Sequence, residues 1–163
     1  MAAIDIGDVN VVSRSYGLSA GYLHILKTNP ANLSGKITQV QLYAKTGYSM
    51  VNVRVGTCYI VSGTNYSSRD YEDIGTVAAG AVRTFTVDLD VEAGDVLCCT
   101  FTSGQLCFVE PGGAGIRYIF GGSIPFTNEE TSNASTTGDL SFGGTGATIE
   151  VSGTNAIFFG MNF

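Results

Sequence analysis

The sequence contains one histidine, His24, so any Ser-His-Asp or Cys-His catalytic arrangement would have to use it. His24 lies in the apolar segment Tyr-Leu-His-Ile-Leu, where alternation along a strand places it on the same face as Tyr22 and Leu26. A histidine in that setting is more often structural than catalytic. The sequence also has neither a nucleophile elbow nor a papain-like cysteine motif. We therefore predict that the protein is not an enzyme and needs no cofactor.

The four cysteines favour buried free thiols over disulfides or a metal centre. They are too few and too unevenly spaced for a disulfide-dense scaffold, and with a single histidine they lack the paired spacing of a zinc site. Free cysteine behaves as a small apolar side chain, which suits a core position. The four are Cys58, Cys98, Cys99 and Cys107.

Acidic residues recur at every second position near the middle of the chain. Asp88, Asp90 and Glu92 fall on the outward side of a predicted strand, and Asp95 follows the next turn. Grouped carboxylate oxygens can bind calcium. The simpler interpretation is that these residues keep one face of a sheet soluble and discourage pairing at its edge. No metal site is predicted, and calcium at these four residues stays an alternative.

The chain has eight tyrosines and no tryptophan. Tyr43 is expected on the outward face of a strand, whereas Tyr66 and Tyr71 fall in an expected loop over Ser62–Glu72. Exposed tyrosines can stack on sugar rings, so these three are the candidate glycan contacts. The alternative for Tyr43 is packing against a neighbouring chain.

Alternation with a period of two predicts the strands that would position these residues. Residues 39–44 and 84–92 each alternate between aliphatic and polar side chains, which is typical of strands with one buried face. The three valines of residues 51–55 repeat the pattern and are expected to point inward. Gly56 follows them and permits a bulge.

Residues 96–102 and 105–110 predict a β-hairpin closed by a Ser-Gly pair. One face of this hairpin belongs in the core. The opposite face holds Cys98 and Cys107, which are too far apart for a disulfide, and it is unusually apolar for a solvated surface. We expect a loop or another subunit to cover it, which makes both cysteines candidate partner contacts. The predicted core face consists of Leu97, Cys99, Phe101, Leu106 and Phe108.

Further strands are predicted where short apolar runs lie between clusters of glycine, asparagine and serine. Roughly nine to eleven strands without intervening helices indicate an all-β fold, an antiparallel β-sandwich that is jelly-roll-like and has little helix. The 163 residues fit one domain over 1–163. Residues Gly121–Gly138 are expected to form a long loop. The further strands are Val9–Arg14, Tyr22–Leu26, Ile116–Phe120, Asp139–Phe142, Thr148–Val151 and Ala156–Phe163.

Charge and hydropathy argue against several function classes. Acidic side chains number 14 against 8 basic ones, and the net charge of −6 disfavours binding to nucleic acid phosphates. No apolar run is long enough for a membrane span, and no signal peptide is visible at the amino terminus. We predict neither a nucleic acid partner nor a membrane span.

The carboxyl-terminal residues Ile157–Phe163 are too apolar for a free tail. Alternation places Ile157, Phe159 and Met161 on one face, which is expected to meet the core. Phe158 and Phe163 are not on that face. We expect this end to dock. Phe158 and Phe163 are therefore candidate contacts to a second subunit or a host particle.

Four pieces of the chain within residues 29–110 resemble small β-sandwich proteins encoded among bacteriophage structural genes. They are Asn29–Asn32, Gly35–Ala44, Arg69–Glu72 and Val91–Leu97. The resemblance implies a virion accessory protein, such as a capsid decoration protein or a fibre or tail module. We predict a non-enzymatic structural protein of a phage-like virion that acts through contact surfaces as a homo-oligomer. The alternative is a carbohydrate-binding or adhesin module at an extracellular surface.

Overall fold

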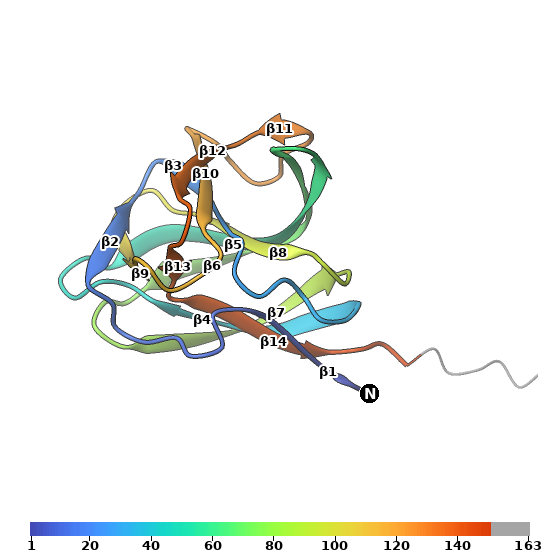
Figure 1. The fold of residues 1–163 in the computed structure, drawn as a ribbon. Coiled ribbons are helices and arrows are strands. Elements are labelled where there is room, and N and C mark those ends of the chain that lie inside the picture. Colours follow the sequence, from blue (N-terminus) through green and yellow to red (C-terminus); the bar gives the residue numbers. More distant parts are fainter. Residues whose placement is uncertain (151–163) are drawn as a thin grey trace, which may run out of the picture.

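The computed structural model describes residues 1–150, which form an all-β fold (Figure 1). This part of the chain has fourteen strands, every pairing is antiparallel, and no helix interrupts them. The predicted all-β, sandwich-like architecture is therefore confirmed. None of the described residues belongs to an apolar helix of bilayer-spanning length. The strands are β1 (Ala3–Gly7), β2 (Tyr16–Ser19), β3 (Tyr22–Leu26), β4 (Gly35–Tyr43), β5 (Met50–Ser62), β6 (Asn65–Val77), β7 (Val82–Val91), β8 (Val96–Thr100), β9 (Gln105–Val109), β10 (Ile116–Phe120), β11 (Glu129–Glu130), β12 (Ser132–Ser135), β13 (Asp139–Leu140) and β14 (Phe142–Ala147).

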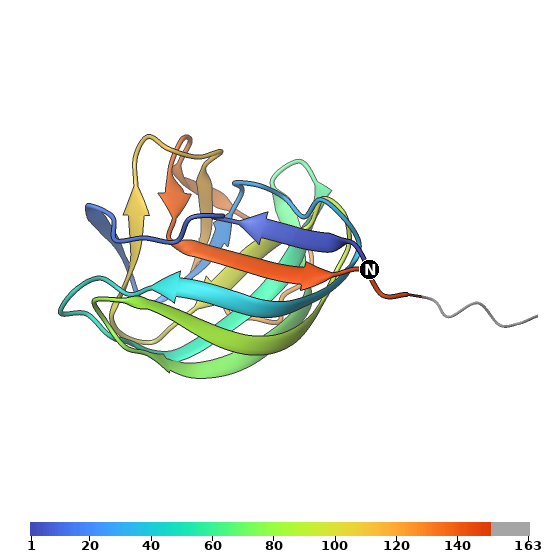
Figure 2. The same cartoon turned by 90° about the horizontal axis from the view of Figure 1, so that it is seen from below.

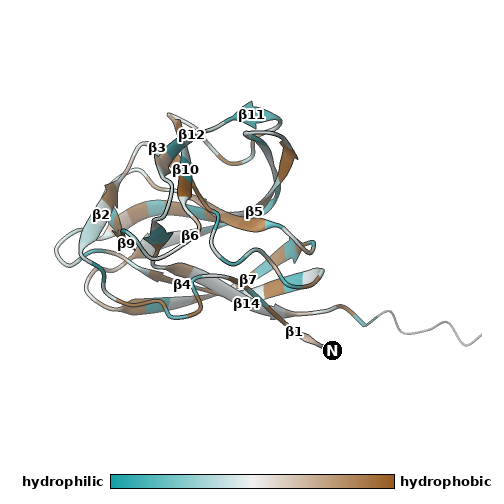
Figure 3. Ribbon diagram, viewed as in Figure 1, coloured by the Kyte–Doolittle hydropathy of each residue, from teal (hydrophilic) through white to brown (hydrophobic). Residues whose placement is uncertain are grey.

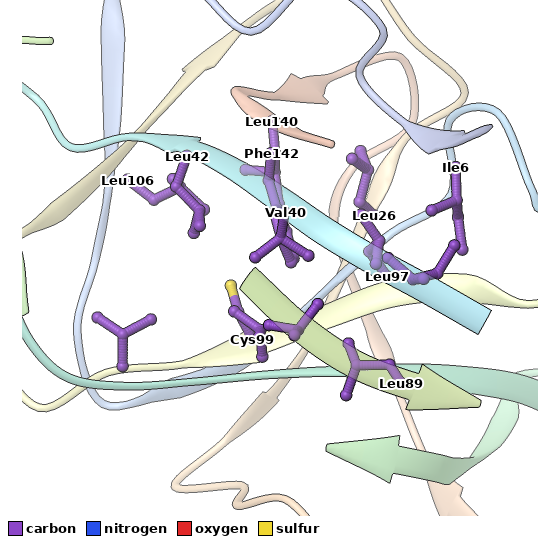
Figure 4. Packing of buried hydrophobic residues seen from close by; sticks show 14 of the residues in the cluster. Ile6, Leu26, Val40, Leu42, Leu89, Leu97, Cys99, Leu106, Leu140 and Phe142 are labelled. Carbon is purple, nitrogen blue, oxygen red and sulfur yellow. The ribbon is translucent and has the colours of Figure 1, made fainter. Parts of the chain in front are cut away.

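A four-stranded sheet, ordered β1-β14-β4-β7, packs against part of a seven-stranded sheet, ordered β11-β6-β5-β8-β3-β10-β12 (Figure 2). The alternation predicted for β4 and β7 makes the interface, because Val40, Leu42 and Leu89 are all fully buried in one cluster between the sheets. Figure 4 shows these side chains beside Leu97 and Phe142 in what we call the sandwich core. Burying one such aliphatic side chain contributes about 1.5–3 kcal/mol.

The seven-stranded sheet curls so that its two end strands, β11 and β12, approach each other. These two strands are also consecutive in the sequence. Only Thr131 separates β11 from β12, so the sheet forms a nearly closed barrel (top of Figure 1). Alternate residues of the shared strands fill the barrel and the sandwich. In β3, Leu23 and Ile25 belong to the barrel, whereas Leu26 belongs to the sandwich core. The barrel core consists of Leu23, Ile25, Cys58, Tyr66, Val96, Cys98, Ile124 and Phe126.

A buried arginine, Arg117, links the strands at the place where the barrel closes. Arg117 of β10 donates to the Thr131 hydroxyl, to the Thr131 carbonyl (2.6 Å) and to Asn133 Oδ1 (2.7 Å). Thr131 in turn donates through its hydroxyl and its backbone N–H to the Thr64 carbonyl, at the tip of the β5–β6 hairpin. Within residues 1–150 no carboxylate forms an ion pair with Arg117. Neutral oxygens therefore satisfy the guanidinium and connect β12 to the hairpin tip.

Four register shifts interrupt the pairing of β5 with β6. One lies between Thr57 and Cys58, which pair with Asp70 and Ser68, so the extra residue is Arg69 on β6 and the bulge predicted at Gly56 is not found there. An earlier shift includes Asn52, whose φ of 51° lies in the left-handed region. This shift moves Val51 to the surface, so the prediction that Val51 points inward is wrong.

The predicted hairpin of β8 with β9 does not form. β8 pairs with β3 and β5, whereas β9 pairs with β2 and β13 in a separate three-stranded sheet. Gly104 has a φ of 92°, and a Cβ atom there would lie 2.2 Å from the Ser49 carbonyl oxygen. The Ser-Gly pair therefore carries the chain closely past Ser49 from one sheet to the next. The predicted core face is nevertheless confirmed, with Leu97, Cys99, Phe101 and Leu106 in the sandwich core and Phe108 packed against it.

Some of the other strands and loops predicted from the sequence match the structure, and others do not. β3 and β10 begin and end as predicted. Residues 62–72 are not a loop, because a turn at Gly63 and Thr64 leads directly into β6. Residues 9–14 are irregular instead of forming a strand, since the Asp8 carboxylate accepts a hydrogen bond from the Asn10 N–H (2.9 Å) and bends the chain.

The strand count exceeds the prediction because short or glycine-rich strands carry little alternation. β1 and β2 were not predicted, and the expected loop over 121–138 contains β11 and β12. Residues 148–150 form no strand, contrary to the prediction for Thr148–Val151. The predicted strand Ala156–Phe163, with Phe158 and Phe163, lies outside the described residues.

Candidate functional site

A groove of about 360 Å³ lies between the three-stranded and the seven-stranded sheet. β3 contributes Tyr22 and His24 to its lining, β10 contributes Tyr118, and β9 contributes Phe108. The wall is completed by Gly17, Leu18 and Ser19 of β2 and by Ala134 of β12. We call this hollow the aromatic groove, since four rings from three strands line it.

Contacts between rings fix the aromatic side chains around the groove. Tyr22 meets Tyr118 edge to face with centroids 5.6 Å apart, because antiparallel pairing of β3 with β10 brings both rings to one face of the sheet. Phe120 packs on Tyr22 at 5.3 Å and is 78% exposed. On the other wall, Tyr16 packs on Phe108 at 5.3 Å. The aromatic surface therefore continues from the groove onto the exterior.

His24 lies at the base of this cluster as a neutral ring. It is 3% exposed and stacks on Phe101 at 5.7 Å. Its Nε2 lies 3.0 Å from the Ser19 carbonyl oxygen, which can only accept, so Nε2 carries the proton. Burial lowers the pKa of His24 and keeps the ring uncharged at neutral pH. Nδ1 has no hydrogen-bond partner among residues 1–150.

The four cysteines are free and buried, as predicted. Burial raises the pKa of the Cys98 and Cys99 thiols, so both stay protonated at neutral pH. Ile124 and Phe126 pack with Cys98 in the barrel core, so a segment of this chain covers the apolar face. Cys98 and Cys107 have no exposed surface, which corrects their assignment as partner contacts.

The four carboxylates considered for calcium are each paired with a cation. Each ion pair engages at least one oxygen of its carboxylate and balances part of the negative charge that would attract a calcium ion. They agree with the simpler interpretation, a solvated face of alternating charge. The described residues contain no cluster of potential metal ligands. The pairs are Lys36 with Asp88 (3.1 Å) and Asp90 (2.8 Å), and Arg69 with Glu92 (3.0 Å) and Asp95 (3.1 Å).

A second charged cluster anchors the irregular segment after β1. Arg14 Nη2 lies 2.6 Å from the Asp8 carboxylate and 3.1 Å from that of Asp139, while Arg14 Nε donates to the Ser141 hydroxyl (3.0 Å). Burial, together with the nearby Asp8 charge, raises the pKa of Asp139. Because Arg14 lies between the two carboxylates, the cluster is suited to fastening this segment to the β13–β14 region.

The tyrosines proposed from the sequence as glycan contacts do not form one site. Tyr66 is 2% exposed and belongs to the barrel core, which excludes it from a surface contact. Tyr71 lies on β6 beneath the Arg54 guanidinium, 4.8 Å from its ring centroid. Tyr43 is half-buried on β4. The structure instead brings together Tyr22, Tyr118 and Phe120, which the sequence reasoning did not select.

The sequence did contain a signal for these residues. Tyr22 and His24 are two residues apart in β3 and therefore lie on one face of that strand, and the same holds for Tyr118 and Phe120 in β10. Both strands were predicted with correct bounds. What the sequence lacked was the pairing of β3 with β10, two strands about ninety residues apart, because non-local pairing leaves no local pattern.

A separate exposed surface lies on β5 near the turn of the β5–β6 hairpin. Tyr59, Ile60 and Val61 are consecutive and exposed, Ile60 by 57%. Figure 3 shows hydrophobic colouring at this end of β5, beside β11. Arg69 packs over the Tyr59 ring, 4.9 Å from its centroid. We call these three apolar residues the hairpin patch.

Comparison with models of protein families, with curated proteins and with solved structures gave no match to this chain. Function is therefore inferred from the surfaces and side chains described above.

Proposed function

We propose that this protein is a non-enzymatic structural protein of a phage-like virion, a capsid decoration protein or a fibre or tail module, that acts through protein–protein contacts. The hairpin patch carries this proposal. Consecutive exposed apolar residues are uncommon on a protein that works alone, and they are typical of the centre of a subunit interface. The patch therefore suits a second copy of this chain, in a homo-oligomer with closed symmetry.

The state of the potentially reactive groups is consistent with a structural role. His24 is neutral and hydrogen-bonded to Ser19, and the Cys98 and Cys99 thiols are buried with raised pKa values. Lys36 and Arg69 each bind two carboxylates. These groups stabilise the fold and leave the exposed surfaces for contact.

At the β7 edge of the four-stranded sheet, side chains block the pairing of a further strand. The backbone N–H groups of Asp88 and Asp90 in the end strand β7 donate to Glu72 (2.6 Å) and Asp70 (2.8 Å), respectively. Carboxylates that occupy edge N–H groups discourage another strand from pairing there. Assembly is therefore expected through the hairpin patch and not through this edge.

Light scattering on the purified 163-residue protein tests the homo-oligomeric assembly that the proposal requires. We expect a discrete oligomer, and we expect the double variant Ile60→Ser, Val61→Ser to have the monomer mass of 17.0 kDa. Val9→Ser is the matched control, because Val9 is 76% exposed outside the patch and its loss leaves the oligomer intact. A wild-type monomer at every concentration, or an unchanged oligomer in the double variant, would contradict the proposal.

A further inference from the structure

We infer that the aromatic groove binds a neutral saccharide. This site is separate from the hairpin patch, and binding there does not depend on the proposed assembly. The volume of about 360 Å³ lies within the range of about 300–1,000 Å³ typical of small-ligand sites. Tyr16 and Phe120, both exposed, extend the aromatic surface on either side.

The lining selects against charged ligands. None of the eight residues that line the groove carries a formal charge, since burial keeps His24 neutral. A phosphate, sulfate or carboxylate would need a guanidinium or ammonium partner, and an amine would need a carboxylate. The groove offers instead the hydroxyls of Ser19, Tyr22 and Tyr118. Its chemistry therefore matches an uncharged ligand with many hydroxyl groups.

Aromatic rings supply the second part of the match. A pyranose presents C–H groups on its faces and hydroxyls around its edge, so it can pack on a ring while its hydroxyls reach polar groups. Tyr22 and Tyr118 combine a ring with a hydroxyl in one side chain. Phe120, which is 78% exposed, adds apolar surface where a second sugar unit of an oligosaccharide would lie.

His24, in the groove lining, carries an acceptor that no other group of residues 1–150 uses. Its Nε2–H is engaged by the Ser19 carbonyl, which leaves a lone pair on Nδ1. That atom is one of two buried side-chain polar atoms in residues 1–150 that have no hydrogen-bond partner. Buried acceptors of this kind are uncommon in native structures and require an explanation. Nδ1 itself has almost no exposed surface, so the match to a saccharide rests on the uncharged lining, the aromatic rings and the hydroxyls of the groove.

An array of neutral and sialylated oligosaccharides, probed with the full-length protein, tests the inference. We expect binding to neutral oligosaccharides, and titration calorimetry with the neutral oligosaccharide of highest signal then gives the dissociation constant. Tyr118→Ala and Phe120→Ala should each weaken binding by about tenfold through loss of ring stacking. Tyr71→Ala is the control, because Tyr71 is exposed on β6 away from the groove lining, and its affinity should equal that of the wild type.

Several results would overturn the inference. They are binding to no neutral oligosaccharide, binding to sialylated ones alone, and equal affinities in the wild type and Phe120→Ala. Phe120 is almost fully exposed, so Phe120→Ala folds and stays informative even where Tyr118→Ala is unstable. The oligomer mass of Phe120→Ala, measured by light scattering, should equal that of the wild type, which separates a failure of saccharide binding from a failure of assembly.

Discussion

The hydrogen bond from His24 to the Ser19 carbonyl determines both the tautomer and the charge of the ring. The Ser19 carbonyl accepts from Nε2–H, which leaves a lone pair on Nδ1. Protonation of Nδ1 would bury a positive charge beside Phe101, and no carboxylate among residues 1–150 raises the pKa of the ring. The sequence predicted the face on which His24 lies, because alternation is local. It did not predict the Ser19 contact, which depends on how β2 leaves one sheet and β3 enters another.

The first prediction concerns His24 and pH. Its folded-state pKa is lowered below 6.5, so as the pH falls the unfolded chain takes up the proton first. The His24 contribution to stability is full above 6.5 and is lost as the pH falls below that value. Urea unfolding between about pH 5 and 8 should show this slope in the wild type and a smaller slope in His24→Gln.

The comparison with His24→Gln also removes the effect of other groups. Asp139 has a raised pKa and therefore contributes in the opposite sense, since its folded form binds a proton more readily than the unfolded chain does. This contribution is common to both proteins and cancels in the difference. Equal slopes in the wild type and the variant would show that His24 is not the titrating group.

Strand bounds were predictable where alternation is strong, but strand partners were not. β3 and β10 match their predicted ranges, whereas β8 and β9 have the predicted inward faces without pairing to each other. A buried face looks the same in the sequence whether the next strand folds back or crosses to another sheet. Close packing of Gly104 against Ser49 decides between these outcomes, and that is a tertiary contact.

The second prediction concerns the element that closes the barrel. Arg117→Met removes three donors and leaves the Thr131 carbonyl and the Asn133 side chain without their partner. We expect the free energy of unfolding to fall by about 2 kcal/mol, the usual cost of unsatisfied buried groups. Arg83→Met is the matched control, because Arg83 is exposed on β7 and its loss should cost less than about 0.5 kcal/mol. Equal effects in urea unfolding would mean that Arg117 does not hold the barrel closed.

At the scale of the whole molecule, two cores share the same strands. β3 and β8 each direct alternate side chains into the sandwich core and the barrel core, so displacing either strand disrupts both cores. The aromatic groove lies where the three-stranded sheet meets this shared layer. Its position therefore follows from non-local sheet pairing, which explains why the sequence alone did not indicate Tyr22 and Tyr118 as residues of one groove.

The last prediction tests whether the shared strands make the two cores one cooperative unit. Cys98 and Cys99 are adjacent on β8, yet Cys98 belongs to the barrel core and Cys99 to the sandwich core. In two variants that retain only Cys98 or only Cys99 of the four cysteines, labelling by a thiol reagent reports opening of the corresponding core. We expect both thiols to react only through global unfolding, with protection equal to the unfolding free energy of each variant. Faster labelling of Cys98 would mean that the barrel opens alone, because a shared β8 should expose its two faces together.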